Sequence, residues 1–298
     1  MRNRCLLMSI LALASSAMLA TSTFAAEAGV TEHEGVSLKP QMLVQFGGFG
    51  ITNSMLVTWI VAAGIIIFSQ IATRRVKRIP SGIQNFWEWL VEGLHNFLEN
   101  IIGRELVAKG FWYFATVFIF ILFVNWFGLI PGIGTIGWGH YATGNFHIDR
   151  PLLRGGNADL NMTTAMSAIF FVMWFVWAIQ ANGVGGFLKE LFGPKGETTG
   201  IVKILMIVIF FAVGWLEVIS ILFRPIALSF RLFGNIYAGE SILEAMSTMN
   251  PWLSPILPIP FYFLEVLVGF VQALVFMLLT AVFTMLIAEH QGGPEHAH

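Results

Sequence analysis

The sequence predicts an all-α polytopic membrane protein with five membrane-embedded helices, the last two of them long and tilted, and one amphipathic helix on the membrane surface. The first observation behind this prediction is composition, because 56% of the 298 residues are hydrophobic and only 11% are charged. A soluble domain has about 25% charged residues. The second observation is that apolar residues form runs of about 20, the length needed to cross a bilayer. The third is that Lys and Arg gather beside these runs on one side.

Composition and motifs exclude several classes of function. The formal net charge of −1 gives no basic surface for nucleic acid. The single cysteine, Cys5, provides neither a disulfide framework nor a cysteine metal site. The sequence contains no phosphate-binding GxxxxGK(S/T) loop and no GxGxxG that opens a helix after a strand, so ATP binding is not expected. The histidines at 140, 147, 290, 296 and 298 are scattered over loops and the tail, and we therefore predict no metal and no other cofactor.

Residues 1–26 have the parts of a secretory signal peptide. Arg2 and Arg4 form a basic start, a short apolar run follows, and small residues provide a cleavage site. The alternative is a short anchor that is not cleaved. Cleavage leaves residues 27–298 as a single membrane domain, with an external N-terminus over 27–49. This type of signal favours a bacterial plasma (inner) membrane over a mitochondrion, whose targeting peptides are amphipathic and rich in Arg and Ser.

The membrane domain is predicted to begin with one span and one surface helix. Residues 50–72 are apolar for long enough to cross the bilayer, and the basic string RRVKR (74–78) follows at once. By the positive-inside rule, this end of the span is cytoplasmic. Residues 80–109 repeat apolar positions at helical spacing and are interrupted by glutamates, which predicts an amphipathic helix on the cytoplasmic face.

Two further spans take the chain outward and back again. Residues 111–130 predict an outward span that stops at a Pro-Gly pair, and residues 131–160 predict an external loop rich in Gly and His. Residues 163–182 return inward. The lysines in 183–203 then indicate a cytoplasmic segment.

Residues 204–248 are too long for one upright span, because ~1.5 Å per residue gives ~70 Å of helix against a hydrocarbon core of ~30 Å. Two spans that turn at Arg224-Pro225 are one alternative. A single proline kinks a membrane helix more often than it reverses it, so we favour one long, tilted and bent helix. Prolines between 250 and 260 make a stronger break. Residues 261–288 then predict a last long, tilted helix that leaves the C-terminus in the cytoplasm.

One of the most apolar parts of the chain also carries several charges. They are Glu217, Arg224, Arg231, Glu240 and Glu244. A charge at the bilayer centre costs at least ~2.5–3.5 kcal/mol, so an ionisable residue there is a hypothesis for a functional site. On a helical wheel of about 100° per residue, Ser220 and Asn235 share a face with Arg231, whereas Glu240 lies on the opposite side.

This pattern predicts two water-accessible half-paths that meet near Arg231 without crossing the membrane as one channel. The guanidinium group is effectively always protonated, so it repels a passing cation and attracts a partner carboxylate. On the last helix, Glu265 and Gln272 are seven residues apart and share a face. Glu240 and Glu265 are candidate proton relays. The simpler interpretations also stand, namely hydrogen-bonded structural carboxylates and, for Asn235 and Gln272, a hydrogen bond between helices.

Four strings resemble subunit a of the F-type ATP synthases. They are LSFRLFGNIYAGE (228–240), NWFGLIPG (125–132), ADLNMT (158–163) and VQALVFMLLT (271–280). The resemblance implies a proton-translocating stator subunit of a rotary ATP synthase, with two offset half-channels that lead to the carboxylate of a c-subunit ring. Ion flow would turn the ring and drive ATP synthesis in a separate catalytic head, so the chain would not be an enzyme by itself.

The resemblance also implies partners and site residues. The partners are the c-subunit ring, the b subunits of the peripheral stalk, the remainder of the complex and membrane lipid. The proton-translocation residues are Arg231, Glu240, Glu265, Gln272, Asn235, Glu217, Ser220 and Asn161. Arg231 matches the essential arginine of the family, Glu217 and Ser220 match the inner half-channel, and Asn161 matches a residue near the outer entrance. Glu265 stands where some members carry histidine, so two glutamates replace a mixed pair.

Other classes of protein stay open on the sequence alone. A secondary transporter with a charged site at the membrane midplane would use discontinuous helices around a pocket. An assembly subunit would use its buried charges only for packing, and a gated channel would conduct ions without a ring. The coupling ion, proton or sodium, is also open, because the ring carboxylate and its neighbours chiefly set it.

Overall fold

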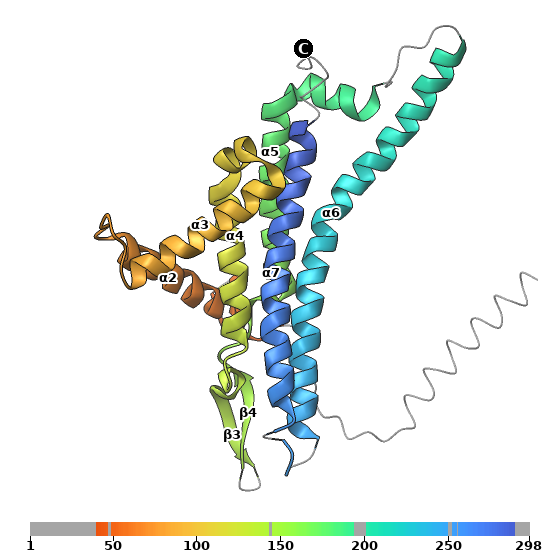
Figure 1. Ribbon diagram of the computed structural model, residues 1–298. Helices are drawn as coiled ribbons and strands as arrows, with labels where there is room; N and C mark the ends of the chain where they lie inside the picture. The colour runs from red at the N-terminus through yellow and green to blue at the C-terminus, as the bar shows by residue number, and fades with distance from the viewer. Residues whose placement is uncertain are drawn as a thin grey trace, which may run out of the picture. The chain divides into compact units, whose positions relative to one another are not determined.

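The computed structural model describes residues 40–46, 49–142, 145–193, 201–249, 252–254 and 256–289 (Figure 1). The expected signal peptide (1–26) and most of the expected external N-terminus lie outside these residues. Five of the described helices are long and apolar enough to cross a membrane. Together with one amphipathic helix, they confirm the predicted fold class of a multi-pass, all-α membrane protein.

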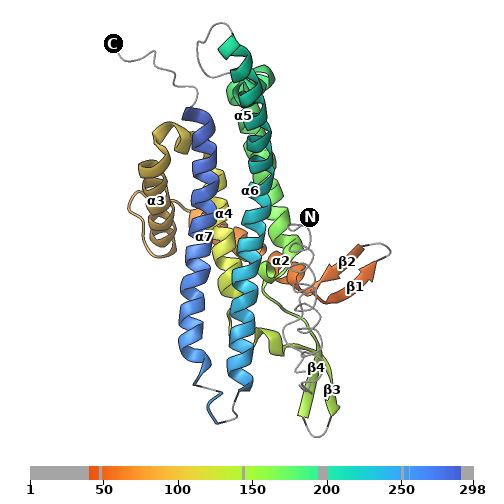
Figure 2. The same ribbon diagram turned by 90° about the vertical axis from the view of Figure 1, so that its right-hand side faces the viewer.

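The five apolar helices are α2 (Asn53–Thr73), α4 (Arg104–Gly128), α5 (Leu160–Phe192), α6 (Ile201–Thr248) and α7 (Pro258–Glu289). The amphipathic helix is α3 (Ile83–Ile102). Two antiparallel hairpins pair β1 (Met42–Phe46) with β2 (Phe49–Thr52) and β3 (Gly137–Ala142) with β4 (Asn145–Pro151). Single 3-10 turns are η1 (Ile133–Thr135) and η2 (Gly156–Ala158). Figure 1 shows α7 between α4 and α6, and Figure 2 shows α5 along α6.

The start of α2 differs slightly from the expected span. Residues 49–52 pair as strand β2, so the helix begins after them rather than at 50. Thr52 caps the helix, because its side-chain oxygen accepts a hydrogen bond from the backbone N–H of Met55 (3.3 Å). The inner face buries Val57 and Val61, whereas isoleucines on the outer face are exposed, as expected for a helix that contacts lipid.

Helix α3 has the predicted amphipathic character but not the predicted length. It buries Leu98 against α4 and exposes the charged face that includes Glu92. The expected helix over 80–109 is divided at Gly103, which has a φ of 78°. Residues with a Cβ rarely adopt that conformation. Residues 104–109 therefore belong to α4.

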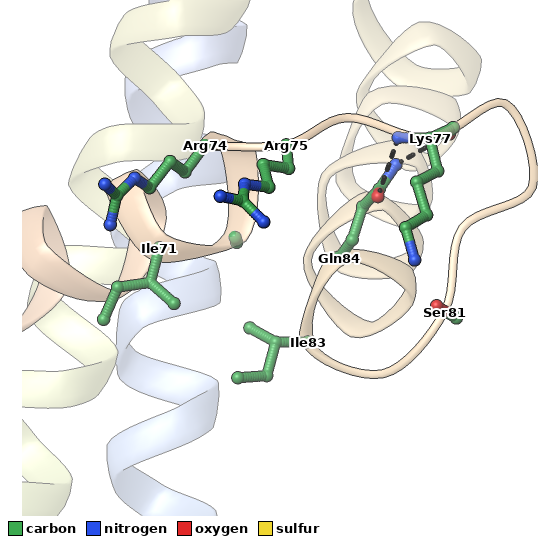
Figure 3. Close-up of a pocket in the computed structure, with 8 residues that line it drawn as sticks. Ile71, Arg74, Arg75, Lys77, Ser81, Ile83 and Gln84 are labelled. Carbon is green, nitrogen blue, oxygen red and sulfur yellow. Dashed lines mark hydrogen bonds between the residues drawn. The ribbon is translucent and has the colours of Figure 1, made fainter.

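One side chain holds the loop between α2 and α3. Nε2 of Gln84 donates to the carbonyl oxygen of Lys77 (3.0 Å), and Oε1 of Gln84 accepts from the backbone N–H of Lys77 (3.1 Å) (Figure 3). The same Nε2 donates to Oε1 of Glu88 (2.7 Å). This buried amide thereby fixes the conformation of the basic loop that follows α2.

The segment expected as an external loop, residues 131–160, contains ordered structure. The β3–β4 hairpin is followed by η2, whose residues are buried. A Cβ at Gly156 would lie 2.6 Å from Oγ1 of Thr58 and 2.9 Å from Cγ1 of Val124. Only glycine therefore fits where η2 passes between α2 and α4.

Gly156→Ala is expected to destabilise the protein by about 1–3 kcal/mol, because the added methyl group overpacks the contact between η2, α2 and α4. Thermal unfolding of the full chain in detergent measures this effect. Gly134→Ala is the matched control, since a Cβ at Gly134 would meet no atom within 4 Å. Equal unfolding midpoints for the two variants would contradict the packing argument.

Helix α5 is longer than the expected 163–182. Asp159 caps its start, because its side chain accepts from the backbone N–H of Asn161 (2.9 Å). Gly183, with a φ of 66°, interrupts the helix just after the expected end. The chain then continues as helix to Phe192 where a cytoplasmic loop was expected, and Figure 1 shows this last part at an angle to the rest of α5.

Helix α6 is a single helix of 48 residues that continues through Pro225. The alternative of two spans that turn at 224–225 is therefore wrong. At ~1.5 Å per residue, α6 is about 70 Å long, which exceeds a ~30 Å hydrocarbon core more than twofold. Figure 1 shows α6 beside α7 over much of its length and leaning away from α7 toward the start of α6.

Candidate functional site

Two of the predicted site residues join α6 to α7. Nδ2 of Asn235 donates a hydrogen bond to Oε1 of Gln272 (2.8 Å). Gln272 is buried, whereas Asn235 lies at the exposed surface of α6. In an apolar bundle, such a bond satisfies polar groups that lipid cannot satisfy.

Glu265 is a buried carboxyl group on α7, with only 5% of its surface exposed. Its Oε1 has no hydrogen-bond partner among the described residues. The carboxyl group packs directly on Gly239 of α6, where a Cβ would overlap it. Glycine at 239 thus lets the two helices approach around this acid. A buried polar atom without a partner is costly.

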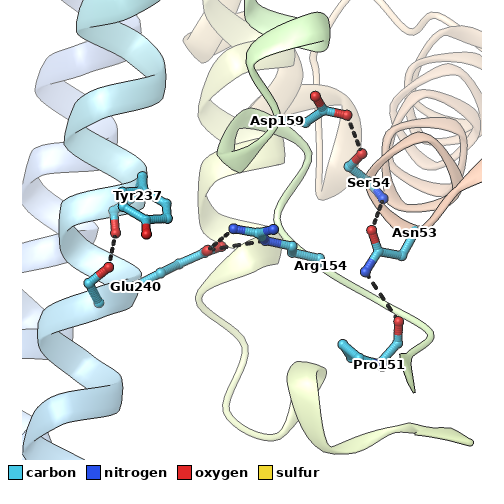
Figure 4. Close-up of polar contacts among 8 residues, drawn as sticks. Asn53, Ser54, Pro151, Arg154, Asp159, Tyr237 and Glu240 are labelled. Carbon is cyan, nitrogen blue, oxygen red and sulfur yellow. Dashed lines mark hydrogen bonds and ion pairs between the residues drawn. The ribbon is translucent and has the colours of Figure 1, made fainter. Parts of the chain in front are cut away.

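Glu240 forms an ion pair with Arg154, a residue that the sequence analysis did not place in the site. Nη2 and Nε of Arg154 each lie 3.4 Å from Oε2 of Glu240, and both side chains are largely buried (Figure 4). A Cβ at Gly155 would lie 2.9 Å from Oε1 of Glu240, so the backbone next to the arginine also stays close to the carboxylate. In the sequence, the only sign of a role for Arg154 is that a basic residue lies in the segment expected outside the membrane, where Lys and Arg are few.

Two asparagines tie the segment that carries Arg154 to the bundle. Nδ2 of Asn157 donates to Oδ1 of Asn125 on α4 (2.6 Å), and Nδ2 of Asn125 donates to the carbonyl oxygen of Gly269 on α7 (3.0 Å). Both asparagines are buried. This chain of amides connects η2, α4 and α7, and thereby holds Arg154 in position beside α6.

A second link joins the same segment to α2. Oγ of Ser54 donates to Oδ2 of Asp159 (2.6 Å), and Nδ2 of Asn53 donates to the carbonyl oxygen of Pro151 (3.2 Å) (Figure 4). Asp159 is 3% exposed. Asn161, which the resemblance placed near the outer entrance, has an exposed side chain. At the start of α5, Asp159 and Thr163 are buried polar residues, and Asn161 is not.

Arg231, Glu217 and Ser220 lie on the exposed surface of α6. Within the described ranges, these three side chains form no hydrogen bond or ion pair with the other candidate site residues. Arg231 and Glu240 thus have different environments although they lie on the same helix. Arg231 is at the exposed face, and Glu240 is turned toward Arg154.

Small residues flank Arg231 on the exposed face of α6. Ala227, Gly234 and Ala238 lie one or two turns from the arginine and are all exposed. A Cβ at Gly234 would meet nothing within 4 Å. Small residues let another helix approach closely, so this face has the shape of a helix-packing surface with one charge at its centre.

Arg224 has a packing role. Its guanidinium carbon lies 4.6 Å from the centre of the Phe283 ring on α7, a cation–π contact between the two long helices. The backbone oxygen of Phe283 also accepts from Nε1 of Trp174 on α5 (3.1 Å). Arg224 therefore helps to join α6 to α7 at a position nearer the start of α6 than Glu240. In the described part of the chain, no three His, Cys, Asp or Glu side chains gather to hold a metal ion.

The fold and site define a multi-pass membrane protein in which buried polar side chains connect α2, α4, α6 and α7 beside an exposed arginine. The family model described as ATP synthase A chain matches residues 55–285. The protein named ATP synthase subunit a from Trichlorobacter lovleyi is 35% identical over 247 residues, which cover 83% of this chain and 89% of that protein. The chain belongs to the ATP synthase A chain family, which confirms the resemblance inferred from the sequence.

Two more relatives have the same name. ATP synthase subunit a from Citrifermentans bemidjiense is 32% identical over 247 residues, again 83% of this chain and 89% of that protein. The one from Gloeobacter violaceus is 33% identical over 229 residues, which cover 77% of this chain and 80% of that protein.

Proposed function

We propose that this chain is the proton-translocating stator subunit of a rotary ATP synthase, with two offset half-channels that lead to the carboxylate of a c-subunit ring. The observation that carries the proposal is the separation of Arg231 from Glu240 on α6. The arginine is exposed, and the glutamate is turned inward to Arg154. Membership of the ATP synthase A chain family supports the same function.

The outer half-channel would use the buried acids of α6 and α7. A proton that enters near Asn161 passes to Glu240 and Glu265, and reaches the ring carboxylate past the contact between Asn235 and Gln272. A carboxylate that turns into lipid must be neutral, because a charge in hydrocarbon is costly. The outer acids therefore supply the proton that lets the ring turn away from the stator.

Arg231 would separate the two half-channels. Its guanidinium group keeps its proton, so it passes none along, and it attracts each ring carboxylate that has lost one. Glu217 and Ser220 lie on the exposed stripe of the same helix, and they would lead the released proton to the inner side. A proton then crosses the membrane only by travelling on the ring.

The packing surface around Arg231 would be the contact with the ring. Its small residues allow ring helices to approach the arginine closely. The b subunits of the peripheral stalk and the remainder of the complex would bind other faces, and ATP would be made on other subunits. We place the protein in the bacterial inner membrane, with its N-terminus and β3–β4 outside and α3 and its C-terminus on the cytoplasmic side.

The assembled complex, reconstituted in liposomes, provides the test. An imposed proton gradient is expected to drive ATP synthesis, and an uncoupler to stop it. ATP synthesis that requires a sodium gradient instead would overturn the proton as coupling ion. If neither a proton gradient nor a sodium gradient drives ATP synthesis, and the isolated chain takes up a solute, the result would favour the secondary transporter.

Arg154→Gln is expected to lower proton-driven ATP synthesis about tenfold, because it removes the partner that holds Glu240 in the outer half-channel. A tenfold loss corresponds to an interaction free energy of the size found between charged side chains in contact. A double-mutant cycle that combines Arg154→Gln with Glu240→Gln measures this interaction free energy. The double variant should be no slower than the slower single variant. Arg154→Lys, which keeps the charge, should retain most of the rate. Losses that multiply in the double variant would show that the two residues act independently.

A further inference from the structure

We propose that the pocket between the end of α2 and the start of α3 binds the phosphate group of an anionic phospholipid. The pocket has a volume of about 380 Å³, within the range of small-molecule sites. It lies between the end of α2, which is long and apolar enough to span a membrane, and the start of the amphipathic helix α3. This site is separate from the proton path and goes beyond the proposed function.

Three cationic side chains line the pocket. They belong to Arg74, Arg75 and Lys77, and no acidic residue is among the described residues of the lining. Arginine presents N–H donors in a fork that matches a phosphate group, and lysine adds a compact positive charge. A pocket of this composition favours an anionic ligand with several acceptor oxygens.

Hydrogen bonds within the protein hold the loop that forms the pocket. Gln84, which also lines it, holds both backbone polar groups of Lys77. Helix α3 starts beside the pocket without a side-chain cap, because Gly82 precedes it. The backbone N–H of Phe86 donates to the carbonyl oxygen of Gly82 (3.2 Å), and the N–H groups that precede it in α3 have no side-chain cap, so they can meet an anion. Two independent features, a fixed basic loop and an uncapped helix start, thus favour the same ligand.

The apolar part of the lining favours a lipid over free phosphate. Ile71 and Ile83 complete the pocket, and Figure 3 shows both isoleucines below the three cationic side chains in that view. Ile66 and Ile67 continue the exposed apolar surface along α2. A phosphate group bound by the cations would leave acyl chains along this surface. Basic residues beside a span attract anionic lipids of the cytoplasmic leaflet.

Photolabelling of the assembled complex tests the proposal at this site. A photoactivatable phosphatidylglycerol is added to the complex in detergent, and mass spectrometry quantifies labelling of residues 71–84. Unlabelled phosphatidylglycerol is expected to compete at least fivefold better than phosphatidylcholine. Inorganic phosphate at millimolar concentration should not compete. Equal competition by the two lipids would overturn the preference for an anionic headgroup, and full competition by inorganic phosphate would overturn the lipid assignment.

Matched variants identify the cations. Arg75→Gln is expected to lower labelling about fivefold, the effect of one cation near a charged membrane surface. Arg78→Gln removes the same charge from the same loop but does not line the pocket, so labelling should be unchanged. Equal labelling of the two variants would overturn the proposal. The competition experiments use the native protein and decide the question even where a variant does not assemble.

Discussion

Arg231→Ala is expected to reduce ATP-driven proton pumping in inverted membrane vesicles to background. The arginine is the exposed charge at the centre of the packing surface on α6, and it is the group proposed to attract the ring carboxylate. Without it, the carboxylate has no fixed counter-charge between the two half-channels. The barrier to protons is lost as well, so the passive proton permeability of the vesicles should rise.

Arg224→Ala is the matched control for this experiment. It makes the same substitution two helical turns away on the same helix, at an arginine that packs on Phe283. Pumping should fall at most a few-fold, because a cation–π contact that is not fully desolvated is worth roughly 0.5–1 kcal/mol. Normal pumping by Arg231→Ala in a fully assembled complex would refute the proposed role of Arg231. Equal loss in both variants would assign the effect to packing.

The second large effect is expected for Glu265→Gln, which should lower proton-driven ATP synthesis about a hundredfold. The amide has nearly the size and shape of the carboxyl group and fills the same space against Gly239, but it cannot accept and release a proton. Loss of a positioned acid–base group typically costs 10²–10⁴-fold in rate. The unfolding midpoint of the complex should not fall, because the carboxyl oxygen that is replaced has no partner among the described residues.

This variant separates a proton relay from structural packing. A relay predicts an assembled, stable complex that transports protons slowly. A structural carboxylate predicts poor assembly with normal transport in each complex that does assemble. Glu92→Gln, at an exposed position on α3, removes one carboxylate outside the bundle and should leave both measurements unchanged.

Hydrophobic length was sufficient to predict the fold, but not the ends of its elements. Runs of apolar residues identify each span, since a helix, unlike a single strand, forms all of its backbone hydrogen bonds within one segment and can therefore cross lipid alone. The breaks at Gly103 and Gly183 depend on positive φ angles. The sequence has 30 glycines, and nothing local distinguishes those two. The single helix α6 was predictable because one proline, without other turn residues, rarely reverses a chain.

The candidate site was predictable only where it follows the spacing of one helix. The different environments of Arg231 and Glu240 agree with their positions on a helical wheel. The ion pair between Arg154 and Glu240 joins residues that are 86 positions apart, and no periodicity connects a loop to a helix. The bond between Asn157 and Asn125 likewise depends on how η2 packs between helices, which is a property of the assembled bundle.

The buried contacts of Asn157 and Asp159 allow Arg154 to be positioned before α6 enters the membrane. Ser54 with Asp159 and Asn125 with Asn157 connect segments that all leave the ribosome before α6. Chains fold as their N-terminal parts emerge, so this early platform can form while α6 is still being synthesised. When Glu240 enters the bilayer, its counter-ion Arg154 is already in place. In that order of assembly, the acid would enter as half of an ion pair, and its transfer from water into the membrane would be less costly.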